Sequence, residues 1–525
     1  MSLGLDREAE AARRKPMNII LFLTDQERAI QHFPEGWAEQ NLPGMQRLQQ
    51  NGLTFENAFC SSCMCSPSRA SLLTGLFPAQ HQVKDTLTFG MEYSDLEQEL
   101  PRNVPNLATI MRKAGYDVVY KGKWHTAKPL SDPQTENEAL LAWEPRDLAV
   151  YGFDRWTEPD AGENQNIVQF GGGTANNDER YMTGETLHGP KQEGVLDYLR
   201  SVNPRKPFCL IVSLVNPHDV LAYPRTWKIG GYESDDWIQG DIGLPETWDE
   251  DLSTKPTVQQ QFLDTLKIGL GPLPTEDDKR AYVNFYGNLL KHIDAYLVDM
   301  LDVLEEQDLL EDTLVIRSSD HGEMAMAHGG MRQKMFNAYE ESLRVPLIYS
   351  NPRLYPQPRR SDALVSHVDL LPTLADFLGM RRRRIWEGVS YAPLLLDPAA
   401  PAPQDHVLYT YDDIRAGQDT DQLVDPPNRI VTIREGRWKL SRYFDADGNV
   451  PDQWEMYDLQ EDPLERDNLA RPGYRGTQEQ TTARFRLKLK LEAQQARRLQ
   501  PLRRKLVPVP TGASSGKRQA RRVKT

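Results

Sequence analysis

The sequence has 525 residues, which is long enough for a large hydrophobic core and for more than one subdomain. Its hydrophobic content of 39% and charged content of 26% are typical of a globular protein and argue against a disordered or fibrous chain. The formal net charge of −14 works against binding to nucleic acid or to an anionic membrane, and four cysteines are too few for a disulfide framework.

The N-terminal segment shows no apolar stretch of the kind that a secretory signal needs. Met1–Lys15 is charged, and the first apolar run, Ile19–Leu23, is far too short to span a membrane. We therefore expect a cytoplasmic protein.

Short apolar runs alternate with helical patterns along most of the chain. Met17–Thr24 is a predicted buried strand, and Met45–Asn51 is a predicted helix that ends at Gly52. This alternation predicts an α/β fold in which helices sandwich a mostly parallel central sheet. The further strands expected are Leu53–Ala58, Tyr116–Tyr120, Pro207–Val215, Thr313–Arg317 and Val345–Tyr349, and the further helices are Val104–Ala114 and Tyr282–Leu304.

The segment Cys65–Gly75 predicts a helix with a reactive group at its positive end. Pro67 suits the first helical position, Ser66 suits the N-cap, and Gly75 suits the residue that ends the helix. This arrangement places Cys65 just before a helix N-terminus, where backbone N–H groups face an anion.

Three cysteines within six residues, at 60, 63 and 65, would also suit a zinc knuckle or a disulfide. The only other cysteine is Cys209, in an apolar run, and no Cys/His pair with ligand spacing lies nearby. We therefore interpret Cys60, Cys63 and Cys209 as buried, inert thiols.

Ionisable side chains follow four of the predicted strands at their carboxyl ends. In open α/β sheets ligands bind at this edge, so we expect these side chains to form one site. They are Asp25, then Lys123 with His125, then His218, and finally Asp320 with His321.

Two polar stretches, Lys128–His188 and Ala222–Asp278, are rich in Gly, Pro, Asp and Trp and show no sustained period. Long irregular segments in a compact domain often form functional rims. We expect substrate selectivity there, with ordinary surface structure as an equal alternative.

From Trp386 onward the pattern changes to that of a smaller antiparallel sheet. Arg429–Leu440, Arg442–Phe444 and Trp454–Asp458 are predicted strands, with a turn at Asp445–Asn449 between two of them.

The C-terminal tail is strongly basic. From Arg484 to Thr525 there are 14 Lys/Arg residues and one acidic residue, Glu492. Arg484–Leu499 favours a short helix, and the chain beyond Pro501 favours coil. We interpret this segment as a solvated tail, and the alternative is an arm that binds an acidic surface of a neighbouring subunit.

The segment that begins at Cys65 resembles the sulfatase signature Cys-x-Pro-Ser-Arg-x-x-x-Leu-Thr-Gly, with every fixed position present. Other segments resemble further elements of this family in the same order, and the resemblance spans roughly residues 16–470. These segments are Asn18–Gln26, Gly122–His125, Asn216–Asp219, Ser319–Glu323, Lys334, Tyr339–Ser342, Arg344–Pro346, Trp454–Leu459, Asp462–Pro463 and Asn468–Leu469.

The resemblance implies an alkaline-phosphatase-like fold and hydrolysis of sulfate monoesters of aryl or small alkyl alcohols. It implies that a formylglycine-generating or sulfatase-maturating enzyme oxidises Cys65 to formylglycine, whose hydrated aldehyde is the nucleophile. The implied partners are this maturation enzyme and a small sulfate ester. Neither nucleic acid nor a membrane is expected as a partner, because the chain is acidic. The expected domains are a catalytic α/β domain at 16–385, a sheet-and-helix subdomain at 386–480 and the basic tail at 481–525.

The resemblance also implies one divalent metal ion. Carboxylates suit a hard cation, and an amide oxygen and an imidazole nitrogen can complete its coordination. Such an ion would polarise the sulfuryl oxygens as a Lewis acid. Calcium is the first expectation, and manganese or magnesium comes next. The ligands implied are Asp25, Gln26, Cys65, Asp320 and His321.

The catalytic residues implied are Cys65, Arg69, Lys123, His125, His218 and Lys334. Arg69 and Lys123 bind the hydrated formylglycine. His125 takes a proton from its remaining hydroxyl after the attack, which expels sulfate and restores the aldehyde. Lys334 and His218 contact the sulfuryl group and the departing oxygen, and either could be the general acid.

The remaining histidines and acidic residues near these elements carry weaker expectations. We expect His328 to line the pocket and Glu340 and Glu341 to brace the fold. The histidines expected to be structural are His32, His81, His188, His292, His367 and His406.

One departure from the family pattern bears on the substrate. Many sulfatases have Asp-Asp and Asp-Asn where this chain has Asp25-Gln26 and Asp320-His321, and the latter pairs resemble the choline-sulfatase and phosphonate monoester hydrolase branch. That branch is promiscuous between sulfate and phosphate esters and often forms dimers or tetramers, which leaves a homo-oligomer open.

Lys123 and His125 point back towards sulfatases, so sulfate ester hydrolysis is favoured. The alternative at the same site is phosphonate monoester or phosphodiester hydrolysis. The alternative of another class is a non-catalytic binding module with unmodified Cys65.

Overall fold

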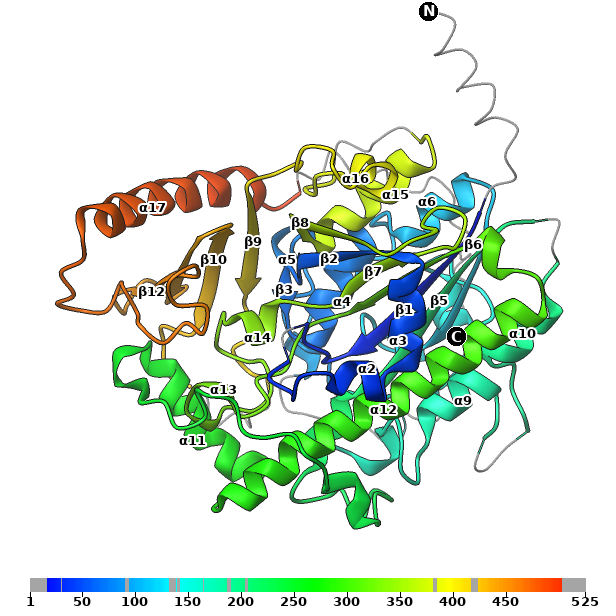
Figure 1. Cartoon of the computed structure of the whole chain (residues 1–525), viewed down its shortest axis with the longest axis horizontal. Coiled ribbons are helices and arrows are strands. Elements are labelled where there is room, and N and C mark those ends of the chain that lie inside the picture. Colours follow the sequence, from blue (N-terminus) through cyan, green and yellow to red (C-terminus); the bar gives the residue numbers. More distant parts are fainter. Residues whose placement is uncertain are drawn as a thin grey trace, which may run out of the picture.

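The computed structural model describes residues 17–502, apart from 30, 90–93, 132–137, 139–141, 164, 187–189, 204–205, 381–384 and 417–423. Two β-sheets lie side by side, and the larger one has helices on both faces (Figure 1). In these residues no helix combines the length and the apolar character that crossing a bilayer requires.

The larger sheet has seven strands in the order β4-β5-β1-β6-β7-β2-β8. The four strands β4, β5, β1 and β6 run parallel, and β7 is antiparallel to both of its neighbours. The predicted α/β fold with a mostly parallel sheet is therefore confirmed. The strands are β1 (Asn18–Asp25), β2 (Gly52–Phe59), β4 (Asp117–Gly122), β5 (Phe208–Pro217), β6 (Thr313–Ser319), β7 (Leu347–Ser350) and β8 (Arg359–Ser366).

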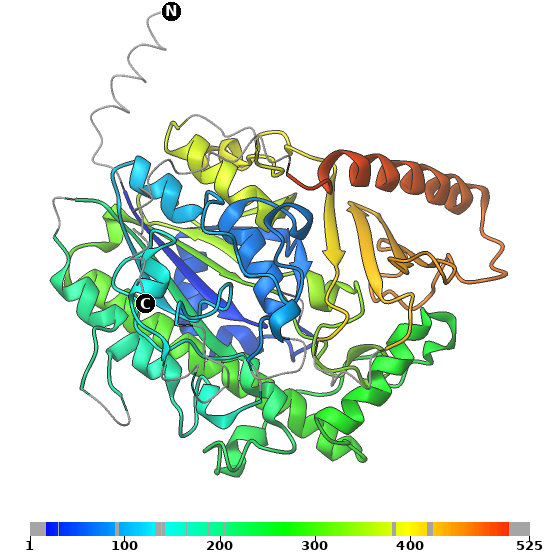
Figure 2. The same ribbon diagram turned by 180° about the vertical axis from the view of Figure 1, so that it is seen from behind.

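Alternate residues of β1 pack into two different hydrophobic clusters, because successive side chains of a strand point to opposite faces. Leu21 packs with residues of α4 and α6, whereas Phe22 packs with residues of α10 and α12. Helix α12 crosses one face of the sheet in Figure 1, and Figure 2 shows the opposite face with α4 and α6 in front of it. Both faces of the strand are thus buried, which explains its continuous apolar sequence.

The α-helices are α2 (Trp37–Asn41), α3 (Pro43–Gln50), α4 (Cys65–Thr74), α5 (Pro78–His81), α6 (Leu107–Lys113), α8 (Arg146–Ala149), α9 (Asn177–Thr183), α10 (Val195–Ser201), α11 (Thr257–Gly269), α12 (Glu276–Glu306), α13 (Ala327–Gly330), α14 (Glu340–Leu343), α15 (Leu370–Phe377), α16 (Ala392–Leu396) and α17 (Gln478–Arg498). Short 3₁₀ turns lie at Ser94–Leu96, Ile167–Gln169, His218–Ala222, Asp235–Ile238, Leu252–Thr254, Leu310–Asp312 and His367–Asp369.

The smaller sheet has the order β12-β11-β10-β9-β3. Its strands are antiparallel except for the parallel pair β3 and β9. Helix α17 covers it through Ala483, Leu487 and Leu491, which are buried against β10 and β11. The strands are β3 (Ser62–Cys63), β9 (His406–Tyr411), β10 (Arg429–Glu435), β11 (Trp438–Phe444) and β12 (Gln453–Asp458).

The predicted single strand Arg429–Leu440 is wrong, because the chain reverses inside it. Strand β10 ends at Glu435 and β11 begins at Trp438, so Gly436 and Arg437 form a two-residue hairpin turn. The strands β8 and β9 were not among the predicted elements. The domain boundaries at 385 and 480 stay predictions, and the chain beyond residue 502 lies outside the described residues.

Gly122 ends β4 in a conformation that only glycine accepts without strain. Its φ is +117°, and a Cβ atom there would lie 1.9 Å from the carbonyl oxygen of Ser213 on β5. We expect Gly122→Ala to lower the free energy of unfolding by about 2–4 kcal/mol, because both the dihedral and the contact must relax. Thermal and urea denaturation measure this loss.

Gly436→Ala is the matched control, because no heavy atom lies within 4 Å of the added Cβ. Equal stability of the two variants would contradict the tight approach of β4 to β5.

Candidate active site

The ionisable residues that follow the strands meet at one edge of the larger sheet. The order β4-β5-β1-β6 makes these four strands neighbours, and their carboxyl ends point the same way. Asp25 ends β1, Lys123 follows β4, His218 follows β5 and Asp320 follows β6. The structure therefore brings together side chains that are far apart in the sequence.

Four buried side chains form a cluster that suits a metal ion. Asp25, Cys65, Asp320 and His321 each place one ligand atom within 4.8 Å of the others. The Sγ atom of Cys65 lies 3.2 Å from Nε2 of His321 and 3.7 Å from Oδ1 of Asp25. Two buried carboxylates beside an imidazole are a donor set that fits a divalent cation.

Two positively charged side chains, Arg69 and Lys123, contact the carboxylates of Asp25 and Asp320. Arg69 donates from its NH2 to Asp25 and from its Nε to Asp320, both at 2.9 Å. Lys123 Nζ lies 2.6 Å from Oδ2 of Asp25. Burial alone would raise the pKa of Asp25, but the positive charges of Lys123 and Arg69 hold that pKa well below its usual value. Asp25 is therefore a carboxylate at neutral pH, as metal binding requires.

Cys65 lies in the first turn of α4. The predicted N-cap at Ser66 is wrong, because the helix begins at Cys65 and the Oγ of Ser66 accepts a hydrogen bond from Leu87 N at 3.1 Å. Gly75 ends the helix as expected, with a φ of 69°. Burial, together with the charge of Asp25, raises the pKa of Cys65 to about 11. An unmodified thiol here is protonated at neutral pH and is a weak nucleophile.

The rings of His125 and His218 are buried beside these charges. The Nε2 of His125 donates to the carbonyl of Leu87 at 2.9 Å, so its Nδ1 carries the lone pair. That Nδ1 is buried and has no hydrogen-bond partner among the residues that the structure describes. Burial and the charge of Lys123 hold the pKa of both histidines well below its usual value, so both rings are neutral at neutral pH.

Gln26 and Lys334 lie in contact. Lys334 Nζ donates to Oε1 of Gln26 at 2.5 Å, and Nε2 of Gln26 donates to Oε2 of Glu323 at 2.5 Å. All three side chains are buried.

Two residues of the site were not singled out from the sequence. Glu323 belongs to the segment that resembles the second metal element, and this position was the available signal. Asp160 accepts the backbone N–H groups of Trp124 and His125 at 2.8 and 2.7 Å, and Gly162 O accepts a hydrogen bond from Lys123. Asp160 and Gly162 lie in the polar stretch Lys128–His188, where no sequence pattern marks them.

His328 is fully buried and is surrounded by other side chains. Its ring stacks on Tyr339 with centroids 3.6 Å apart, and its nitrogens lie 2.7 Å from Glu250 and 3.6 Å from Glu341. Glu340 contacts Arg434 and Lys439 of the smaller sheet, as a brace of the fold would.

The other described histidines that were expected to be structural make no contact with the cluster. The nearest contact is that of the His367 ring, which lies 3.2 Å from the Oγ of Ser68 on α4. His32 contacts Arg28, His81 contacts Ser71, His406 contacts Asp405, and His292 packs on Tyr296. His188 lies outside the described residues.

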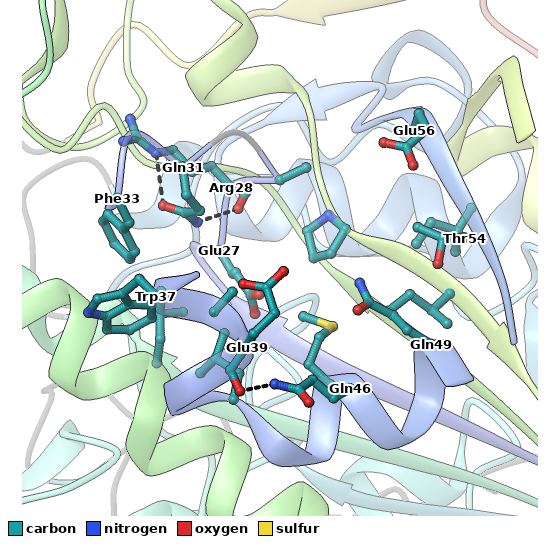
Figure 3. A pocket seen from close by; sticks show the side chains of 18 of the residues that line it. Glu27, Arg28, Gln31, Phe33, Trp37, Glu39, Gln46, Gln49, Thr54 and Glu56 are labelled. Carbon is teal, nitrogen blue, oxygen red and sulfur yellow. Dashed lines mark hydrogen bonds between the residues drawn. The ribbon is translucent and has the colours of Figure 1, made fainter. Parts of the chain in front are cut away.

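A separate cavity of about 330 Å³ opens between the segment after β1, helices α2 and α3, and strand β2 (Figure 3). Glu27 and Arg28 form part of its wall, and Arg28 exchanges two hydrogen bonds with Gln31 there. None of the residues of the buried cluster lines this cavity. It is therefore separate from the buried cluster.

Comparison with known proteins agrees with this geometry. The sulfatase family model matches residues 17–380, and a model of the N-sulphoglucosamine sulphohydrolase C-terminal region matches residues 328–497. A choline-sulfatase of Rhizobium meliloti is 27% identical, over 86% of this chain and 82% of that protein. A Δ4,5-hexuronate-2-O-sulfatase of Bacteroides thetaiotaomicron is 26% identical, over 90% of this chain and 88% of that protein.

Among solved structures, a 2-O GAG sulfatase aligns with a TM-score of 0.68 at 23% identity and covers 92% of both chains. The phosphonate monoester hydrolase of Agrobacterium radiobacter aligns with a TM-score of 0.64 at 22% identity, over 92% of this chain and 96% of that one. The chain belongs to the sulfatase family, which makes it an enzyme of the sulfuric ester hydrolase class.

The His328 cluster predicts a defined pH dependence of stability. Burial alone would lower the pKa of His328, but Glu341 and Glu250 raise it to about 9. Burial alone would raise the pKa of Glu341, but His328 holds it at about 2. The stabilisation by His328 is therefore complete below its ordinary pKa of 6.5 and is lost as the pH rises to about 9. The stabilisation by Glu341 is complete above its ordinary pKa of 4.5 and is lost as the pH falls to about 2.

We expect His328→Gln to lower the free energy of unfolding by on the order of 3 kcal/mol between pH 4.5 and 6.5, where both charges are present. The difference from the parent chain should shrink as the pH rises to 9. Denaturation at a series of pH values measures it. His406→Gln is the control, and a deficit that does not change with pH would contradict the charged pair.

Proposed function

We propose that this chain hydrolyses sulfate monoesters of aryl or small alkyl alcohols, with Cys65 converted to formylglycine and one divalent metal ion, calcium first, bound beside it. The observation that carries the proposal is the buried cluster of Asp25, Cys65, Asp320 and His321, with Arg69 and Lys123 against it. The residues that would hold the ion are these two aspartates, Gln26, His321 and the side chain at position 65.

When present, formylglycine supplies a hydrated aldehyde as the nucleophile, and the metal ion supplies Lewis-acid charge. The raised pKa of the Cys65 thiol supports this modification, because a protonated thiol would be a poor nucleophile. The proposal includes a maturation enzyme as a partner and a cytoplasmic location.

The chain's own residues have distinct tasks. Arg69 and Lys123 place positive charge beside residue 65, where negative charge develops. His125 is neutral and its Nδ1 lone pair is free to accept a proton from the hydroxyl that remains on residue 65. His218 and Lys334 are the two candidates for the acid that protonates the departing oxygen, and His218 would first have to take up a proton, because its ring is neutral. Removal of the positive charge of Arg69 or Lys123 should slow turnover by about 10²–10³-fold.

A second candidate function is hydrolysis of phosphonate monoesters or phosphodiesters at the same site. It is favoured by the pairs Asp25-Gln26 and Asp320-His321 together with the likeness in fold to a phosphonate monoester hydrolase.

Mass spectrometry of the peptide that contains Cys65 tests the proposed nucleophile. Conversion of the thiol to the aldehyde should lower the peptide mass by about 18 Da. Cys65→Ala should abolish turnover, whereas Cys209→Ser, the control, should retain it because Cys209 lies in β5 away from the cluster. An unshifted peptide from a host that matures other sulfatases would overturn formylglycine as the nucleophile.

Matched aryl esters distinguish the two hydrolytic functions. We expect kcat/KM for 4-nitrophenyl sulfate to exceed that for 4-nitrophenyl phenylphosphonate by at least about tenfold, because Lys123 and His125 match the sulfatase pattern. The same metal-loaded preparation serves for both esters. A ratio in the opposite direction would establish the phosphonate alternative.

A further inference from the structure

Glu323 lies behind Gln26 and makes hydrogen bonds with both of its carboxylate oxygens. Oε2 accepts from Nε2 of Gln26 at 2.5 Å. Oε1 lies 2.8 Å from the hydroxyl of Tyr282 and accepts the backbone N–H groups of Ala325 and Gln333 at 3.0 and 2.9 Å. The side chain is fully buried, and no ion pair of Glu323 occurs among the described residues. It therefore acts on its neighbours as a hydrogen-bond acceptor.

The segment that carries Glu323 is itself held in place. Arg28, which is labelled in Figure 3, donates to the carbonyls of Glu323 and Met324 at 3.3 and 3.0 Å. The backbone N–H of Glu323 donates to Glu341 O at 3.0 Å. A carboxylate fixed in this way cannot turn to follow its neighbours, so the neighbours must orient to it.

Gln26 lies between an acceptor and a donor. Its amide has a carbonyl end and an NH₂ end of nearly the same shape, and only the surrounding hydrogen bonds decide which way it points. Glu323 requires the NH₂ end on its side, because a carboxylate oxygen accepts hydrogen bonds and donates none. Lys334, which has only donors, requires the carbonyl end. Both requirements select the same orientation.

We propose that Glu323 is a positioning residue that holds the carbonyl oxygen of Gln26 towards Lys334 and the metal-binding edge. This inference rests on the proposed function, in which Gln26 is a metal ligand and Lys334 contacts the sulfuryl group. The orientation is the one that a cation requires, because a cation attracts a carbonyl oxygen and is repelled by an NH₂ group. Glu323 thereby orients two groups of the site without touching the substrate.

Exchange of the donor and the acceptor tests the proposal. Glu323→Gln keeps the shape, but its new NH₂ group faces the NH₂ group of Gln26, which must turn its own NH₂ towards Lys334. Ca²⁺ affinity, measured by calorimetry on the full chain, should fall by about 10–100-fold, as for other residues that orient metal ligands. Gln26→Glu should also bind less well than the double variant, because its carboxylate faces that of Glu323.

The double variant Gln26→Glu/Glu323→Gln restores a donor opposite an acceptor and keeps an oxygen towards Lys334. It should recover at least about tenfold in Ca²⁺ affinity relative to Glu323→Gln, and kcat should recover with it. Additive losses, with the double variant weaker than either single one, would overturn the proposal. A purely structural role for Glu323 would lower the thermal midpoint of all three variants without this recovery.

Two features keep the outcome interpretable. If Glu323→Gln does not fold, comparison of Gln26→Glu with the double variant still decides, because only the double variant has a complementary pair. Ca²⁺ binding is measured without substrate, so failure of sulfate hydrolysis would leave this result intact. Glu340→Gln is the control, because Glu340 contacts Arg434 and Lys439 and should lose stability without loss of Ca²⁺ affinity.

Discussion

The carboxylate of Asp25 is the group on which the rest of the site depends. It is fully buried, and it is stable there because Arg69 and Lys123 both contact its Oδ2 atom. Arg69 also contacts Asp320, so a single guanidinium joins the ends of β1 and β6. Buried charges of this kind are costly unless each has its partner. The parallel sheet places these two strand ends side by side. It therefore allows one arginine to offset the cost of burying both carboxylates.

The charges around this carboxylate also determine what the site attracts. Asp25 and Asp320 balance Arg69 and Lys123, and Glu323 balances Lys334 across Gln26. A divalent cation at the proposed position would therefore give the site a net positive charge. A site of this sign draws an anionic ester from solution and stabilises the additional negative charge of its reaction. The chain as a whole is acidic, so the attraction is local.

The smaller sheet supports the site from outside. Its strand β3 ends at Cys63, two residues before Cys65, and pairs with β9, so the backbone that leads into α4 is fixed by a strand from the C-terminal part of the chain. Glu340, Tyr339 and their neighbours are likewise held by residues of β10, β11 and β12. The fold by itself does not select the ester, because sulfatases and a phosphonate hydrolase share it.

Local pattern was sufficient to predict much of this arrangement. The apolar run of β1 and the amphipathic pattern of α12 predicted the α/β fold, because strand and helix periods are properties of adjacent residues. The order of ionisable residues after four strands predicted a common edge, since parallel strands end together. The hairpin inside Arg429–Leu440 was missed, because both of its strands have the same β-forming residues and only the pairing of Arg434 with Lys439 reveals the turn.

Contacts between distant residues were decided by the tertiary structure alone. Ser66 has a good N-cap side chain, but it bonds to Leu87 instead, and the helix begins at Cys65, two residues before the predicted first helical position, Pro67. Asp160 and Glu323 hold His125 and Gln26 across 35 and 297 positions, and no local pattern records such a pairing. The sequence by itself determined which chemical groups are present and near which strand ends. Only the packed chain decided their partners, because hydrogen bonds and buried charges depend on distances in space.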